Sequence, residues 1–175
     1  MPPHEKTVNR KTEASGDASL RSPKSLEAIM KISLACDHGT LALKRAVRKH
    51  LEELGHEVVD FGTDTLDSCD YADFGIPAAR AVASGECERG IVLCTTGIGM
   101  SMTANKVKGI RCALLSDLMS ARLTRQHNDA NMIAMGAAVL GEMLALEIVD
   151  VFLTTEFQGG RHQRRIDKIM ALENE

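Results

Sequence analysis

The sequence has few aromatic residues and no long apolar run, and both absences exclude classes of function. Aromatic residues make up 3% of the 175 residues and Trp is absent, so a stacking platform for nucleobases or unphosphorylated sugar rings is not expected. No apolar run approaches the roughly 18 residues that a membrane span requires, and the N-terminus lacks the apolar stretch of a signal peptide. We therefore expect polar recognition in a cytoplasmic protein that binds no membrane.

Charge and cysteine content exclude further partners. The formal net charge is −3, which gives no overall electrostatic reason to bind nucleic acid or an anionic membrane. The five cysteines are odd in number, and their spacings contain neither a C-x-x-C pair nor a zinc pattern. The sequence thus predicts reduced thiols in a reducing compartment and no metal site.

Apolar runs alternate with helical patterns after residue 30. Residues 1–29 mix Lys, Glu, Ser, Pro and Gly without a hydrophobic period, which is typical of a flexible extension that cannot bury enough surface to fold. Each of the five runs that follow is succeeded by an amphipathic segment, which predicts a parallel sheet covered on both faces. The predicted strands are KISLAC (31–36), HEVVDF (56–61), GIVLC (90–94), IRCALLS (110–116) and NMIAMG (131–136).

The predicted fold is α/β: a doubly wound, Rossmann-like, three-layer α/β/α core over residues 31–157. A last helix is predicted after Gly159-Gly160, because Ile166, Ile169 and Met170 fall at helical spacing. The sheet already has its covering helices, so a partner subunit is an economical place for the apolar face of residues 158–175.

The ends of the first and third strands are the expected place for a ligand. In an open parallel sheet, ligands bind beyond the carboxyl ends of the strands, where the strand order reverses. The first strand ends in Cys36-Asp37-His38, and the third ends in Cys94 and a glycine-rich turn. In a 2-1-3 strand order these two segments face each other across a crevice.

Cys94 is the strongest candidate for chemistry. It precedes a turn in which Gly97 and Gly99 let backbone N–H groups converge at a helix N-terminus, and such a nest binds oxyanions. The same positive end favours a thiolate, the form of cysteine that abstracts a proton. A buried structural thiol is the alternative, and it is the interpretation we take for Cys36, Cys87 and Cys112.

The glycine turn has two other interpretations. A dinucleotide site would use Gly97-x-Gly99 and Asp117, but Met102 replaces the third glycine and the motif follows the third strand, so the fingerprint is incomplete. A cysteine phosphatase would need an Arg six positions after the cysteine to clamp phosphate. That position is Met100.

The basic run at 161–165 suggests an anion site. It opens the last predicted helix, where the macrodipole makes each positive charge unfavourable by about 0.3 to 1 kcal/mol. Arg161 and Arg165 are one turn apart, a geometry suited to gripping a phosphate. A solvated basic patch, or pairing with Asp167 and Glu173, is the alternative.

His127 and Asn128 stand at the junction between the fourth helix and the fifth strand. Imidazole titrates near neutrality and can therefore shuttle a sugar hydroxyl proton. By spacing alone, a histidine at a helix end is more often a cap.

Together these residues resemble the type B ribose-5-phosphate isomerases, a family that includes the allose-6-phosphate and galactose-6-phosphate isomerases. The matching pieces run in family order through nearly all of residues 31–175, which makes the collective match specific. They are CDH (36–38), DY (70–71), TGIG (96–99), ANK (104–106), RQHND (125–129) and GGRHQRR (159–165).

The resemblance implies reversible conversion of ribose 5-phosphate to ribulose 5-phosphate through a cis-enediolate, with no metal or nucleotide cofactor. Cys94 would abstract the C2 proton with help from Thr96. His127 would open the furanose ring with help from Asp37, while Asn128 steadies the intermediate. The implied substrate-binding residues are His38, Tyr71, Thr95, Gly97, Ile98, Gly99, Arg161 and Arg165.

The resemblance also implies a homodimer or a dimer of dimers with shared active sites. The last helix would lie at the subunit interface. Cys94 and the Arg161 helix of one subunit would meet His127 and Asn128 of the other.

Three positions bear on how far the resemblance extends. Met100 stands where another subgroup carries a glutamate base, so this chain is of the cysteine type. Ala138 stands where many members supply an arginine to phosphate, and Thr95 replaces the usual glycine after the cysteine. One fewer arginine leaves room for allose 6-phosphate, galactose 6-phosphate or a tetrose phosphate. A non-catalytic sugar-phosphate-binding protein is the remaining alternative, although a pure binder needs neither Cys94 nor His127.

Overall fold

A five-stranded parallel sheet forms the centre of the computed structural model, which describes residues 28–175. Its strands are β1 (Lys31–Cys36), β2 (Glu57–Asp60), β3 (Arg89–Cys94), β4 (Cys112–Leu114) and β5 (Met132–Gly136). The strand order is β2-β1-β3-β5-β4, so the predicted 2-1-3 arrangement is confirmed. The predicted flexible extension at 1–29 lies almost entirely outside the described residues.

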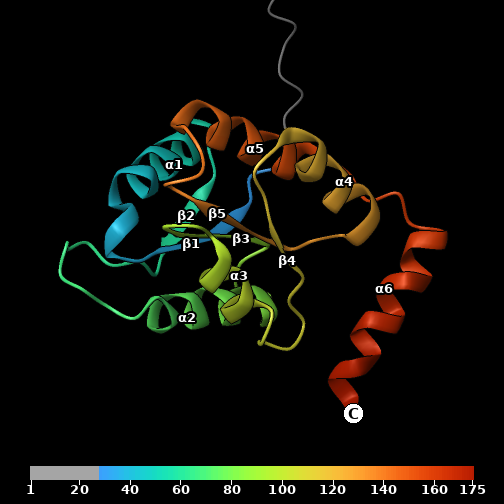
Figure 1. Ribbon diagram of the computed structural model, residues 1–175. Coiled ribbons are helices and arrows are strands. Elements are labelled where there is room, and N and C mark those ends of the chain that lie inside the picture. Colours follow the sequence, from blue (N-terminus) through green and yellow to red (C-terminus); the bar gives the residue numbers. More distant parts are fainter. Residues whose placement is uncertain (1–27) are drawn as a thin grey trace, which may run out of the picture.

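Five helices cover the sheet: α1 (Leu41–Glu53), α2 (Tyr71–Ala83), α3 (Ile98–Ala104), α4 (Leu118–Asn128) and α5 (Glu142–Thr154). Strand side chains alternate between two faces. Ile91 and Leu93 of β3 join the apolar layer of α1, α4 and α5, whereas Val92 and Cys94 join that of α2 and α3. Figure 1 shows these two layers on opposite faces of the sheet, which confirms the predicted α/β/α architecture.

Helix α2 is longer than the sequence pattern indicates. The apolar period predicts a helix only around residues 78–83, whereas α2 begins at Tyr71 and contains Pro77. Gly75 and Pro77 both weaken a helical pattern. A Cβ on Gly75 would lie 2.8 Å from the Met100 Sδ, so close packing on α3 supports this part of the helix.

The predicted last helix is α6 (Arg161–Ala171), followed by a short 3₁₀ turn (Leu172–Asn174). It projects from the side of the sheet next to α4 (Figure 1). Ile166 is buried, but Ile169 and Leu172 are 52% and 63% exposed, so the chain itself covers only part of the apolar face of α6. No helix within residues 28–175 combines the length and apolarity needed to traverse a bilayer.

Candidate active site

The carboxyl ends of β1 and β3 lie side by side, as the sequence predicts. Cys36 pairs with Leu93 across the two strands, and the Asp37 N–H donates to the Leu93 carbonyl oxygen at 3.3 Å. Asp37 is buried, and its Oδ1 accepts the Gly39 N–H at 3.0 Å. These contacts fix the Asp37 carboxylate beside the residue that precedes Cys94.

The turn after Cys94 bends back so that its backbone contacts the Cys94 sulfur. The thiol is 5% exposed, and its Sγ accepts the backbone N–H of Gly97 at 3.1 Å. Gly97 has a φ of +78°, a left-handed conformation that favours glycine, and it leads directly into α3. The backbone thus aims an N–H donor at the Cys94 sulfur at the point where α3 begins.

The turn after Cys94 is pinned to β5. A Cβ on Gly136 would lie 2.6 Å from the Thr96 carbonyl carbon, so only glycine permits this approach. The Thr95 carbonyl accepts the Ala138 N–H at 3.0 Å, and the Thr96 Oγ1 accepts the Ile98 N–H at 3.3 Å. Thr95 and Thr96 are both exposed at the mouth of the site.

His38 and Tyr71 border the same site. The His38 Nδ1 accepts the backbone N–H of Cys69 at 3.3 Å, so a neutral ring carries its proton on Nε2, where it is a donor. The Tyr71 ring lies against Gly99, because a Cβ on Gly99 would come within 2.7 Å of the Tyr71 Cζ. The first group of predicted site residues is thus brought together around the carboxyl ends of β1 and β3.

His127 and Asn128 lie at the opposite end of the sheet, near the amino-terminal ends of β4 and β5. Helix α4 starts after the carboxyl end of β4 and runs back for 11 residues, a length of about 16 Å. It ends beside the segments that enter β4 and β5, where the Arg111 N–H donates to the Asn131 Oδ1 at 2.8 Å. One chain therefore does not bring His127 to its own Cys94.

The ring of His127 stacks on the ring of His162, the second residue of α6. The ring centroids are 4.2 Å apart and the planes differ by 2°. Burial lowers the pKa of His162 below its ordinary value of 6.5, and the charges of His127, Arg161 and Arg165 act in the same direction. A neutral His162 is compatible with this stacking.

Arg161 belongs to the same group as His127. Its Nε donates to the His162 Nε2 at 3.4 Å, and the Gln158 N–H donates to the Gln126 carbonyl oxygen at 3.0 Å, which ties the segment before α6 to the last turn of α4. The prediction that Cys94 and the Arg161 helix of one subunit act together is therefore wrong. The contact between α4 and α6, which the sequence pattern does not reveal, decides the grouping.

Arg161 and Arg165 are exposed and form no ion pair with Asp167 or Glu173, the partners that the sequence suggested. Asp167 instead accepts the Gln163 Nε2 at 2.7 Å, and the Glu173 carboxylate accepts the Gly109 N–H at 2.8 Å. Neither arginine forms an ion pair within residues 28–175. Their positive charges remain available to an anion.

A family comparison covers most of the described chain. The model of the ribose/galactose isomerase family matches residues 32–169. The chain belongs to this family. It is therefore a sugar-phosphate isomerase, and the resemblance to the type B ribose-5-phosphate isomerases is confirmed.

Individual relatives are similar over most of the chain, and their names give different substrates. The structure of ribose-5-phosphate isomerase B from Clostridium thermocellum is 53% identical, covers 83% of this chain and 98% of its own, and has a TM-score of 0.82. The ribose-5-phosphate isomerase B of Escherichia coli is 46% identical over 82% of this chain and 96% of its own length. The D-erythrulose-4-phosphate isomerase of Pectobacterium atrosepticum is 39% identical over 81% of this chain and 93% of its length.

Several residues of this isomerase site carry no role in the sequence argument. The only feature of the sequence that points to Cys69 is its position before Asp70. In the structure, the Cys69 N–H orients the His38 ring. His162 and Asp129 stand inside the matched RHQRR and RQHND motifs, but only the tertiary structure shows what they contact. Asp117, weighed as a ribose ligand, instead caps α4 through the Ser120 N–H at 2.7 Å.

A cavity of about 660 Å³ separates α6 from the body of the isomerase. It is bordered by Asn128, by Ile169 of α6 and by Leu172 of the 3₁₀ turn that follows α6. Among residues 28–175, no three His, Cys, Asp or Glu side chains are grouped to hold a metal.

Proposed function

We propose that this enzyme interconverts ribose 5-phosphate and ribulose 5-phosphate, with Cys94 as the base. The observation that carries the proposal is the contact between the buried Cys94 Sγ and the Gly97 N–H at 3.1 Å, at the carboxyl edge where a doubly wound sheet binds its ligands. The ribose-5-phosphate isomerases B of Escherichia coli and Clostridium thermocellum support the substrate. We further propose a cytoplasmic location.

The chemistry is a proton shuttle without net oxidation. Cys94 takes the C2 proton of the open-chain aldehyde, the C2 electron pair forms a C1–C2 double bond, and the C1 oxygen becomes anionic. The N–H groups of Thr95 and Gly99 offer donors to this enediolate, whereas those of Gly97 and Ile98 donate to the Cys94 Sγ and the Thr96 Oγ1. Cys94 then returns its proton to C1, while the O2 hydroxyl proton passes to O1 with help from Thr96. The product is the 2-ketose.

Ring opening requires a second subunit in this proposal. His127 acts as the acid-base group that opens the furanose ring, supported by Asp37 of the neighbouring chain. Within one chain, however, His127 and Cys94 lie at opposite ends of the sheet. We propose a dimer in which the carboxyl edge of one subunit meets His127, Asn128 and α6 of the other. Exposed apolar side chains lie at or after the carboxyl ends of β3, β4 and β5, which favours an interface: Ile98, Met102, Leu114, Met119 and Val139.

The phosphate would lie between His38 of one subunit and Arg161 and Arg165 of the other. Residues 158–175 would then act as a phosphate-binding helix appended to the isomerase core of residues 31–157. Ala138 leaves one fewer arginine at this site than many family members have. The relative that acts on D-erythrulose 4-phosphate makes a tetrose phosphate the second candidate substrate.

A coupled assay over four-, five- and six-carbon aldose phosphates tests the substrate. We expect the highest kcat/KM for ribose 5-phosphate. Preference for a tetrose or hexose phosphate would change the proposed substrate and keep the proposed chemistry.

Cys94→Ser should lower turnover by about 10² or more, the effect typical of losing an acid-base group, with unchanged substrate affinity. Cys87→Ala, which removes a buried thiol outside the site, is the control. Normal turnover by Cys94→Ser would sink the role of Cys94.

A further inference from the structure

Asp129, the residue directly after His127-Asn128, has an unusual backbone conformation. Its φ is +43°, and it is the only non-glycine residue with a positive φ in the described part of the chain. It ends α4 as a left-handed cap. Aspartate tolerates this region better than most side chains, but glycine or asparagine would satisfy the turn equally well. The conformation alone does not explain a carboxylate here.

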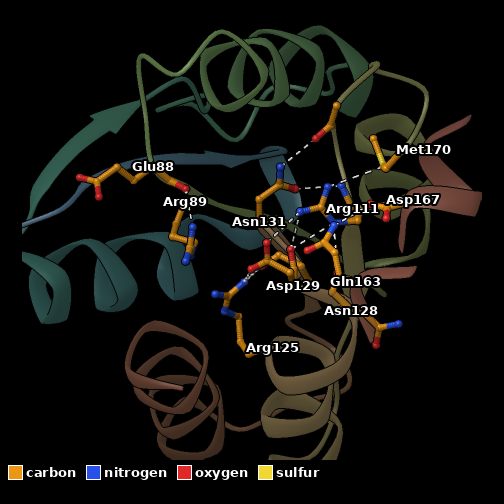
Figure 2. A network of polar contacts seen from close by, with 12 residues as sticks. Glu88, Arg89, Arg111, Arg125, Asn128, Asp129, Asn131, Gln163, Asp167 and Met170 are labelled. Carbon is orange, nitrogen blue, oxygen red and sulfur yellow. Dashed lines mark hydrogen bonds and ion pairs between the residues drawn. The ribbon is translucent and has the colours of Figure 1, made fainter. Parts of the chain in front are cut away.

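Two arginines grip that carboxylate from different elements. The Arg125 Nη1 donates to the Asp129 Oδ1 at 2.7 Å, and the Arg111 Nη2 lies 3.3 Å from the Oδ2. Figure 2 shows both guanidinium groups converging on Asp129 beside Asn128. Arg125 is 4% exposed and comes from α4, whereas Arg111 comes from the segment that enters β4.

The same arginines hold the carbonyl groups of three consecutive residues. The Arg111 Nε donates to the Asn128 carbonyl oxygen at 3.0 Å, and its Nη2 donates to the Asp129 carbonyl oxygen at 2.8 Å. The Arg125 Nη1 donates to the Ala130 carbonyl oxygen at 2.6 Å. Charge-assisted bonds of this kind are stronger and more directional than neutral ones. The backbone after His127 is therefore locked to the sheet.

We propose that Arg111, Arg125 and Asp129 form a positioning clamp that aims His127 at the substrate. The clamp fixes the end of α4, and with it the imidazole that opens the furanose ring. This inference rests on the proposed function, because it assigns His127 to ring opening. None of the three clamp residues contacts the reacting atoms, so each is a positioning residue.

Open-chain and cyclic substrates separate positioning from general damage. Ribose 5-phosphate closes to a furanose through O4 and needs ring opening before C2 deprotonation. Ribulose 5-phosphate is open-chain, because the O5 that would close its five-membered ring is esterified. Solvent-deuterium incorporation at C1 of ribulose 5-phosphate therefore reports proton abstraction without ring opening.

Asp129→Gly is the decisive variant, since glycine keeps the left-handed backbone and removes only the carboxylate. We expect kcat for ribose 5-phosphate to fall roughly 10- to 100-fold, as for a small misplacement of a catalytic group, with KM and C1 exchange nearly unchanged. Arg111→Lys should show the same split, because lysine keeps the charge and loses the forked donors. Arg122→Lys, the same change on the exposed face of α4, is the matched control and should leave both reactions unchanged.

Two results overturn the clamp while leaving the proposed function intact: wild-type conversion of ribose 5-phosphate by both Asp129→Gly and Arg111→Lys, or equal loss of conversion and exchange in the two variants. Equal loss would show that the arginines and Asp129 support the fold without aiming His127. If the wild-type enzyme converts no ribose 5-phosphate, the proposed function fails and the clamp inference fails with it.

Discussion

Lys44 is 2% exposed although it carries a charge, and it organises the loop that leads to the site. Its Nζ donates to the Thr63 carbonyl oxygen at 2.8 Å and pairs with Asp64 at 2.8 Å and Asp60 at 3.0 Å. These contacts attach the loop after β2 to α1. The same loop continues to Cys69 and Tyr71, which border the active site.

Lys44→Met should therefore destabilise the protein by about 2 kcal/mol, because the largely buried Asp60 carboxylate loses its ion pair with Lys44 and keeps only the longer one with Arg48 at 3.5 Å. Asp64 adds little to this cost, since its side chain is 88% exposed. Urea unfolding of the variant measures the change. Lys49→Met, which removes an exposed pair with Glu53, should cost less than about 0.5 kcal/mol. Similar costs for the two variants would contradict this account of Lys44.

Helix α6 depends on few contacts, and one of them is sensitive to pH. His162 joins α6 to α4 by stacking on His127. Burial opposes its protonation most, and the charges of His127, Arg161 and Arg165, which face it, act in the same direction. Its pKa in the folded protein lies below 6.5, so the unfolded state binds more protons as the pH falls. The stabilisation is present above about pH 6.5 and is lost as the pH falls through the folded-state pKa.

Limited proteolysis of α6 between pH 5 and pH 8 tests this expectation. We expect cleavage near α6 to accelerate below about pH 6.5 in the wild type. His162→Gln, which does not titrate in this range, should show a weaker pH dependence. An identical pH profile for the two proteins would show that another group controls the attachment of α6.

The assembly of the whole molecule decides whether a complete active site exists. Inactive Cys94→Ala and His127→Ala subunits, mixed equally and allowed to exchange, should form about half mixed dimers by random pairing. Each mixed dimer has one doubly damaged site and one intact site, so activity should return to roughly a quarter of the wild-type value. If subunits exchange and the mixture stays inactive, the shared site is refuted.

Arg161→Ala in the same design tests the grouping of α6 with His127. Because Arg161 lies beside His162 and His127 in one chain, Arg161→Ala mixed with Cys94→Ala should also regain activity. Arg161→Ala mixed with His127→Ala should stay inactive. Because both residues of one chain serve the same site, each site of such a mixed dimer carries one of the two lesions. Recovery in the second mixture alone would restore the grouping of Arg161 with Cys94.

The sequence by itself determined the five strands and the position of Cys94 at a strand end. These features depend on local periodicity and on turn glycines such as Gly97, which act over a few residues. It did not determine the order of the last two strands, because β4 and β5 are both apolar and pairing is a contact between distant segments. The structure places β5 beside β3 and leaves β4 at the edge.

Only the tertiary structure decided how the candidate site residues divide into two groups. His127 meets His162 across 35 positions of the chain, and Asp129 meets Arg111 across 18. Such contacts depend on how helices and strands pack, and no periodicity records them. The sequence identifies the residues that can do the chemistry. Packing places Cys94 at the carboxyl ends of the strands and His127 near their amino-terminal ends, because α4 runs back antiparallel to the strands.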